Sequence, residues 1–458
     1  MYHGNVKIVV LGLLCVCWSS KKPGTLVNMA DEWLDEEIGL GSLPAIPLAN
    51  ILSYLNQKDL SRCCCISRNF SEIGSSISSW KIWCETVWLL DVSDPLPNKE
   101  WKDVYISQNK KWGKYICCYT AIKKAWNQIE EFTKANCPDI YASLNPGLSD
   151  EELDRITKRH LEGLTLPLDV QCSYRIHNGQ RLVSPGLIGS MAISNHYQSE
   201  SLLDLSVATS GLQHREGLQN CLLLSLCIYT GNGQFIALTD EEGHTPGEIF
   251  WPSPDRSIIT DSDEIASVKM HKFHSACSFT DWITEYAERL SQNYYPVINK
   301  EIFKFEYAAS ATTKGITVKT ATAFLPELSS VHPPLFFFTY RISISMDKDQ
   351  CSVSNKCQLT TRHWYITDGD GEKTEVHGAG VVGQHPTMQP GATHEYVSCT
   401  TFQTPTGTME GYYVFKYCSL SKGNDTFCVK IPAMHFKSLP YIEADVRLNK
   451  IGRKHDEK

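Results

Sequence analysis

The chain has 458 residues, of which 42% are hydrophobic and 21% charged, and its formal net charge is −8 at pH 7. This composition is typical of a globular protein and not of a disordered one, and the length predicts two or three domains. Lysines and arginines are scattered along the chain, so no basic face is available for nucleic acid and we expect no nucleic-acid partner.

Residues 1–28 have a signal-like pattern. Lys7 precedes a mostly apolar run at 8–18, and Ser19-Ser20-Lys21-Lys22 follows it. The run is too short to span a bilayer. Because Met29 opens an acidic sequence suited to a soluble protein, we expect residues 1–28 to be an extension that is not needed. The rest of the chain has no apolar run long enough to span a membrane, so we expect no membrane partner.

Residues 43–88 carry three short apolar stripes. Leu48, Ile51, Leu52 and Leu55 stand at i, i+3, i+4 and i+7, which predicts a helix with an apolar face. A second short helix is expected to begin at Asp59, because a carboxylate suits a helix N-terminus. The third stripe consists of Trp80, Trp83, Cys84, Val87 and Trp88. So small a unit buries too little surface to enclose all these side chains, and part of the apolar surface is predicted to face a partner.

The motifs of this segment stand in the order of an F-box, and the segment resembles that family. The chain reads Leu43-Pro44, then Ile51-Leu52-Ser53-Tyr54-Leu55, then Asp59-Leu60, with tryptophans and Cys84 near the end. The resemblance implies a three-helix domain at 40–90 that inserts into the Skp adaptor of a Skp, cullin and F-box (SCF) ubiquitin ligase. The adaptor-binding residues that it implies are Leu43, Pro44, Leu48, Ile51, Leu52, Leu55, Leu60 and Trp83. Periodicity alone also suits an ordinary three-helix core without a partner.

The 18 cysteines do not form an evenly spaced framework. Cys63-Cys64-Cys65 and Cys117-Cys118 are adjacent, and several others lie in apolar runs, which favours buried thiols in a reducing compartment over disulfides. The sequence contains no Cys-x-x-Cys pair. We therefore expect no zinc-bound RING domain and no metal site.

The middle of the chain alternates helical and turn-rich segments. The pattern predicts a helix at 115–134, a second at 153–161 that starts with Ser149 and three acidic residues, and a last one near 279–283. Together with Leu166-Pro167 and Asn178-Gly179, these features resemble the SUKH (SMI and KNR related) domain, an α/β interaction module, over 116–295. Asn178-Gly179 is by itself a strong tight-turn signal. We interpret His177 as structural, because no nucleophile or acidic motif stands beside it.

After residue 314 the side chains alternate between apolar and polar, which predicts half-buried strands. Tyr340, Ile342, Ile344 and Met346 would share one face, and Asp368-Gly369-Asp370-Gly371 would form a hairpin turn. Six or seven short strands of this kind predict an antiparallel sandwich. The aromatic run Phe336-Phe337-Phe338 is interpreted as core, although an exposed binding face is the alternative.

Gly378-Ala379-Gly380-Val381-Val382-Gly383 matches G-x-G-x-x-G literally. A dinucleotide site needs a helix directly after this motif, but Pro386 and Pro390 would break one there. We interpret the segment as a glycine-rich loop or bulged strand and expect no cofactor.

The same glycine-rich stretch is part of a longer series of motifs. His377 to Pro386, Pro390-Gly391, Tyr396-Val397-Ser398-Cys399, the segment 407–413 and Ile431-Pro432 resemble the ApaG domain in order, over 305–435. The resemblance implies a fibronectin-like antiparallel sandwich without an established set of catalytic residues. The expected fold class is therefore multidomain α+β: a helical F-box, a central α/β domain, the sandwich, and a tail at 436–458.

These resemblances imply a non-catalytic substrate receptor with a Skp adaptor, a cullin scaffold, a RING subunit and protein substrates as partners, in the cytoplasm and nucleus. Catalysis would come from proximity, because a target held near the ubiquitin carrier reacts at a higher effective concentration. Two alternatives are a scaffold that binds the Skp adaptor without directing ubiquitination and an enzyme that uses the glycine-rich loop.

Overall fold

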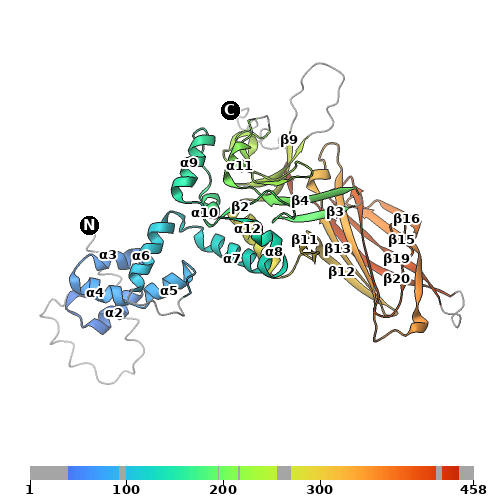
Figure 1. The fold of residues 1–458 in the computed structure, drawn as a ribbon, viewed down its shortest axis with the longest axis horizontal. Helices are drawn as coiled ribbons and strands as arrows, with labels where there is room; N and C mark the ends of the chain where they lie inside the picture. Colours follow the sequence, from blue (N-terminus) through green and yellow to red (C-terminus); the bar gives the residue numbers. More distant parts are fainter. Residues whose placement is uncertain are drawn as a thin grey trace, which may run out of the picture. The chain divides into compact units, whose positions relative to one another are not determined.

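The computed structural model describes residues 40–91, 100–193, 195–214, 217–254, 270–418 and 425–442. The signal-like segment 1–28 and the end of the expected tail, 443–458, lie outside these ranges. The chain divides into two compact units, residues 1–120 and 121–458. Figure 1 shows the elements of both.

Unit 1 is helical in its described part. Its helices are η1 (Leu40–Ser42), α2 (Ala45–Ser53), α3 (Gln57–Cys64), α4 (Arg68–Ser76), α5 (Ser79–Thr86), α6 (Trp101–Trp112) and η2 (Gly113–Tyr115). Most of the first and third apolar stripes lie on α2 and α5, as predicted, and Leu55, Val87 and Trp88 follow the ends of these helices. The second helix begins two residues before Asp59, because Asn56 caps it by accepting a hydrogen bond from the Asp59 amide at 2.9 Å. Helices α4 and α6 were not predicted as separate elements.

Helix α7 (Tyr119–Asn136) leads into unit 2. The expected helix at 115–134 is therefore split, because Tyr115 ends the short η2 turn. The remaining helices of the unit are α8 (Pro138–Ser143), α9 (Asp150–His160), α10 (Leu168–Ile176), α11 (Leu205–Ser210), α12 (Phe279–Ser291) and the short η3 (Glu241–Gly243), η4 (Pro326–Leu328) and η5 (Val353–Asn355). Ser149 and Glu152 form a capping box at the start of α9, as the sequence suggested.

The central α/β part of unit 2 contains two larger sheets. One has the strand order β3-β4-β6 and the other β21-β9-β8-β7-β5, and β1 pairs with β2. The strands are β1 (Leu144–Pro146), β2 (His177–Gln180), β3 (Gly189–Ile193), β4 (His196–Leu202), β5 (Cys221–Leu223), β6 (Ser225–Cys227), β7 (Phe235–Ala237), β8 (Ile249–Pro254), β9 (Met270–Ala276), β10 (Val297–Ile298), β11 (Glu301–Ile302) and β21 (Tyr441–Ile442).

The expectation of a turn at Asn178-Gly179 was wrong, because both residues lie inside β2. Gly179 has φ +60°, and a Cβ there would come within 2.3 Å of the Leu203 carbonyl oxygen. The glycine is needed for this close approach to the backbone and not for a hairpin turn.

The sandwich follows from β12 onward (Figure 1). One sheet has the order β12-β13-β14-β18, and the other has β16-β15-β19-β20 with β17 beside β15. The strands are β12 (Glu306–Thr313), β13 (Ile316–Phe324), β14 (Phe336–Met346), β15 (Cys357–Asp368), β16 (Lys373–Ala379), β17 (Thr387–Met388), β18 (Thr393–Phe402), β19 (Thr406–Tyr417) and β20 (Thr426–Lys437). They are more numerous and mostly longer than expected.

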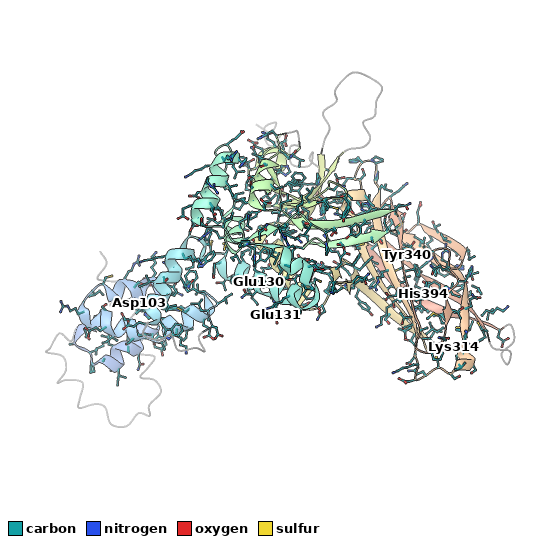
Figure 2. The ribbon with its side chains drawn as sticks, in the orientation of Figure 1. Asp103, Glu130, Glu131, Lys314, Tyr340 and His394 are labelled. Atoms are coloured by element: carbon teal, nitrogen blue, oxygen red, sulfur yellow. The ribbon has the colours of Figure 1, made fainter. Side chains whose placement is uncertain are left out.

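The core of the sandwich uses the alternation that the sequence shows. Tyr340, Ile342, Ile344 and Met346 on β14 are buried, and Tyr340 is labelled in Figure 2. Phe336 and Phe338 are buried in the same core and Phe337 packs against a smaller cluster, so the core interpretation of this run was correct. Residues 368–371 form the predicted turn between β15 and β16.

The sandwich core continues into the central part of unit 2. Trp251 on β8 and Phe273 on β9 belong to the same buried cluster as Phe336 and Ile342. After β20 the chain returns, and β21 pairs with β9. Part of the segment expected as a tail is therefore an edge strand of the central sheet.

Candidate functional site

Helix α2 is apolar on two sides. Its sequence from Ala45 to Ser53 contains no charged residue. Leu48 and Leu52 are buried in unit 1, whereas Ile46 is 77% exposed and Tyr54, the C-cap, 68% exposed. At about 100° per residue, Ile46 and Tyr54 point away from the buried leucines. Exposed large apolar side chains such as these mark an interaction surface, so the exposed side of α2 is the candidate contact surface for a partner.

The structure distributes the eight predicted adaptor-binding residues over three environments. Three are buried by unit 1 itself: Leu48, Leu52 and Leu60. Four are half-buried: Leu43, Ile51, Leu55 and Trp83. Pro44 is exposed. The buried leucines therefore hold the helices together, and only the other five present surface to a partner. Their role in binding an adaptor stays a prediction.

Four exposed apolar residues of this region were not selected from the sequence. Besides Ile46 and Tyr54 they are Ile66, which is 68% exposed after α3, and Ile82, which is 51% exposed on α5. Periodicity emphasised the buried stripe of α2 and missed them. The lack of any charged residue in α2 was the signal that could have found its second apolar side.

Most of the tryptophan stripe is covered within unit 1, and only part of it is left for the partner that the sequence predicts. Trp80 and Trp88 are each 1% exposed, and both rings contact Tyr105 on α6. The Trp80 Nε1 donates to the Gly74 carbonyl oxygen at 2.7 Å, so the indole ties α5 to α4. Trp83 packs edge-on against Trp80 and is only partly exposed. The surface available to a partner therefore lies on α2 more than on α5.

A second candidate site is a cavity of about 320 Å³ in unit 2. The central part and the sandwich both line it, and its apolar walls include Trp251, Trp282, Phe324 and Phe338. Its volume is at the lower end of the range for ligand pockets, of roughly 300–1,000 Å³. It has room for a small group the size of one or two side chains.

Two basic groups at this cavity, Lys304 and Arg289, are paired with carboxylates. Lys304 Nζ donates to Glu200 Oε2 at 3.0 Å, and Arg289 contacts Glu285 and Glu306 at 2.6 and 2.5 Å. Burial would lower the pKa of Lys304, but the Glu200 carboxylate outweighs burial and raises it. Lys304 therefore keeps its charge, and the cavity offers fixed charges beside aromatic walls.

His177 and Glu130 form a separate polar contact in unit 2. His177 Nε2 lies 2.8 Å from Glu130 Oε1, and its Nδ1 lies 3.1 Å from the Asn145 carbonyl oxygen. Glu130, labelled in Figure 2, lies on α7, and its pKa is lowered by the hydrogen bond with His177. With both ring nitrogens engaged and its ring 4.6 Å from that of Trp126, His177 is in the environment of a structural histidine.

Buried thiols in both units are poor nucleophiles. Burial raises the pKa of Cys84 and Cys137 to about 11 and that of Cys221 to about 12. A thiol with such a pKa is protonated at neutral pH and does not react as a thiolate.

The glycine-rich motif lies in the context that the sequence indicated. Strand β16 ends at Ala379, and Gly380 follows with positive φ. Val381 and Gln384 close a turn whose central residues, Val382 and Gly383, also have positive φ. Strand β17 comes next in the described chain, so the helix that a dinucleotide site requires does not follow the motif.

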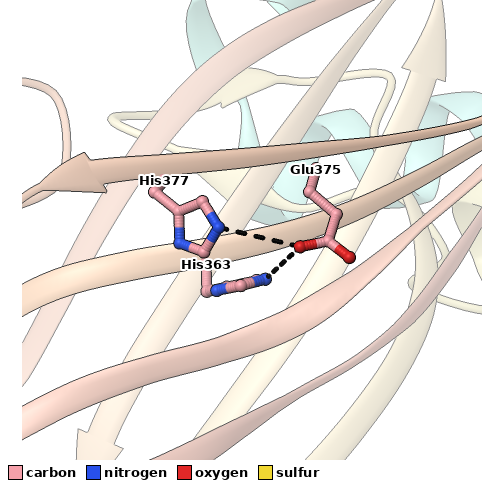
Figure 3. A group of neighbouring side chains, drawn as sticks. All are labelled: His363, Glu375 and His377. Atoms are coloured by element: carbon pink, nitrogen blue, oxygen red, sulfur yellow. Dashed lines mark ion pairs between the residues drawn. The ribbon is translucent and has the colours of Figure 1, made fainter.

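One group of side chains has the composition of a metal site. His363 on β15 and Glu375 and His377 on β16 offer ligand atoms that all lie within 4.8 Å of one another (Figure 3). The three residues come from a hairpin, and their proximity depends on strand register.

Comparison with known families assigns all three parts of the chain. The F-box domain matches residues 40–82, the SMI1 / KNR4 family (SUKH-1) matches 147–285, and the ApaG domain matches 326–417. The protein is thus an F-box protein with SUKH-1 and ApaG domains. The outer limits expected for the domains, 40–90, 116–295 and 305–435, stay predictions.

Relatives extend the match over most of the chain. F-box only protein 3 of Bos taurus is 44% identical over 399 residues, which are 86% of this chain and 83% of the relative. The Homo sapiens protein of the same name is also 44% identical, over 86% of this chain and 82% of its own length. Protein ApaG of Shewanella pealeana is 44% identical over 100 residues, 22% of this chain and 75% of that protein. The chain belongs to the F-box only protein 3 family.

Membership of this family implies a substrate-recognition role in an SCF ubiquitin ligase. In the described ranges, none of the helices combines the length and the apolar character that crossing a membrane requires.

Proposed function

We propose that this protein is a non-catalytic SCF receptor that binds the Skp adaptor through the exposed side of α2 and presents protein targets on unit 2. Ile46 and Tyr54 would lie at the centre of the adaptor contact. Leu43, Pro44, Ile51, Leu55 and Trp83 would add to it, and the cullin and RING subunits would join through the adaptor.

The observation that carries this proposal is that α2 has no charged residue although one side of it is exposed. Burying an isoleucine side chain contributes about 1.5–3 kcal/mol relative to leaving it in water. A partner that covers Ile46 and Tyr54 therefore gains several kcal/mol from α2 alone. An acidic side chain at either position would cost more than a simple loss of contact, because the charge would have to be desolvated.

Unit 2 would hold the target. Its cavity of about 320 Å³ combines aromatic walls with the fixed charges of Lys304 and Arg289, which suits a short segment of another protein. The receptor then contributes proximity, since a bound target has a high effective concentration at the ubiquitin carrier. We also propose that the protein works in the cytoplasm and nucleus.

The test is a co-purification from cells in which the bait is either the full wild-type chain or its Ile46→Asp, Tyr54→Asp double variant. We expect the adaptor and cullin to be lost together, by at least 10-fold, while proteins bound to unit 2 are retained. The matched control is Ile106→Asp, because Ile106 is an exposed isoleucine of unit 1 on α6, outside the F-box match. Retention of adaptor and cullin by the double variant would contradict the proposal.

The structure also explains why Leu48 and Leu52 are poor choices for this test. Both are buried in unit 1, so a charge at either position would unfold the helices and mimic a loss of binding. A reconstituted ligase separates a receptor from a scaffold. If the protein is a receptor, the bound target is ubiquitinated with the wild-type chain but not with the double variant. If it is a scaffold, the target is unmodified with both proteins.

A further inference from the structure

We infer that His363, Glu375 and His377 form a site for one divalent transition-metal ion of the zinc type. The three residues lie on one face of the β15–β16 hairpin. His363 pairs directly with His377 in the antiparallel register, and Tyr365 pairs with Glu375. Since side chains two residues apart on a strand share a face, Glu375 and His377 point to the same side as His363.

The two distances from the carboxylate to the imidazoles suit tetrahedral coordination. Glu375 Oε2 lies 3.4 Å from His363 Nε2 and 3.7 Å from His377 Nε2 (Figure 3). Bonds of about 2.1 Å to nitrogen and oxygen at the tetrahedral angle place neighbouring ligand atoms about 3.4 Å apart. Two imidazoles and one carboxylate are also a ligand set that zinc accepts, with a fourth position left for water.

In the buried member of the group, His363, the Nε2 atom has no hydrogen-bond partner among the described residues. His363 is 7% exposed. Glu375 Oε2 lies 3.4 Å from His363 Nε2, which is too distant for a good hydrogen bond. A buried polar atom without a partner is costly, and coordination to a metal ion would remove that cost.

A residue on the next strand orients the buried imidazole. The Tyr412 hydroxyl lies 3.1 Å from His363 Nδ1, and the two rings stack with their centroids 4.7 Å apart. In a metal-bound ring the Nδ1–H donates to the tyrosine oxygen, which leaves the Nε2 lone pair for the ion. Tyr412 is thus a positioning residue.

Glu375 and His377 are exposed, so an ion can enter from solvent and keep a water in its fourth position. In the described sheet, β16 is the edge strand next to β15, and Tyr412 belongs to β19 on the other side of β15. A bound ion would therefore fasten the edge strand to the interior of its sheet. The glycine-rich turn that follows β16 would be fixed by the same contact.

The test is a calorimetric titration of the chelator-treated full chain with zinc chloride under reducing conditions. We expect the wild type to bind one more equivalent of zinc than His377→Ala, whose exposed position keeps the fold intact. The matched control is His435→Ala, an exposed histidine on β20 of the same sheet, which should bind as many equivalents as the wild type. Zinc that binds to cysteines is common to all three proteins and cancels in the comparison.

Two further readouts identify the ligand set. Tyr412→Phe keeps the stacked ring and should weaken the same equivalent by about 10–100-fold, as expected for loss of an orienting partner. Zinc should also slow amide hydrogen exchange in β16 of the wild type but not of His377→Ala. Equal zinc stoichiometry and affinity in the wild type and His377→Ala would overturn the inference.

Discussion

Gly74 on α4 faces α3 across a close helix contact. A Cβ atom added there would lie 2.5 Å from Cys64 Sγ, so the Cys64 side chain or the packing of α3 on α4 would have to shift. Gly74→Ala would gain about 0.5–1 kcal/mol of helix propensity but lose about 1–3 kcal/mol to overpacking. We expect a net loss of stability, measured as faster hydrogen exchange of the α3 and α4 amides in the full chain.

The control for this prediction shortens the side chain that Gly74 faces. Cys64→Ala removes the sulfur, so the Cys64→Ala, Gly74→Ala pair should be more stable than the sum of the single effects by about 1 kcal/mol. Strictly additive losses would show that the contact with the sulfur is not the cause.

Glu248 is a buried carboxylate between two basic side chains. Its Oε1 lies 2.9 Å from His244 Nδ1 and accepts a hydrogen bond from Lys272 Nζ. Burial would raise the pKa of Glu248, but these hydrogen bonds and the Lys272 charge lower it to about 2 from 4.5. A lowered pKa stabilises the folded state above the unfolded value of 4.5, and this stabilisation is lost as the pH falls toward 2.

We therefore predict that Glu248 contributes to an acid-dependent loss of stability in unit 2, of about 2 kcal/mol between pH 6 and pH 3. In Glu248→Gln this contribution is absent, so the variant should be less stable than the wild type at pH 6. The difference in stability between the two proteins should become smaller toward pH 3. The measurement is the difference between the thermal unfolding midpoints of the two proteins at each pH. A gap that stays constant with pH would contradict the assigned pKa.

At the scale of elements, the sequence was sufficient to predict those features that depend only on residues close together in the chain. The Ser149 cap, the turn at residues 368–371 and the alternation along β14 were all predicted, because each depends on neighbours a few residues apart. The turn prediction at Asn178-Gly179 was wrong because the structure there depends on residues far away in the chain. The strand that contains both residues pairs with β1, more than thirty residues earlier, and long-range pairing overrode the turn propensity.

The candidate site was predictable only in part for the same physical reason. Periodicity finds the side of α2 that packs in its own core, since core packing selects apolar residues at regular spacing. The exposed side has no such constraint within the chain. The proximity of His363, Glu375 and His377 was also not predicted, because these residues meet through strand register and not through a short motif.

At the scale of the whole molecule, the central part and the sandwich share one core, and β21 joins them. Tyr441 lies on β21, and its ring centroid is 6.3 Å from that of Phe273 in the central sheet and 5.7 Å from that of Phe336 in the sandwich. Next to it, the His274 amide donates to the Pro440 carbonyl oxygen at 2.6 Å. A segment after the sandwich therefore stabilises an element that precedes it by about 170 residues.

Tyr441→Ala should accordingly weaken both parts of unit 2 at once. Loss of a partly buried aromatic side chain with two ring contacts should cost about 1–3 kcal/mol. Hydrogen exchange should accelerate in β9 and in β14 together, because both lose the same ring. Tyr307→Ala is the matched control, since Tyr307 on β12 is 59% exposed, and it should leave exchange in both strands unchanged. Acceleration in only one of the two strands would mean that the central part and the sandwich unfold independently, despite the core they share.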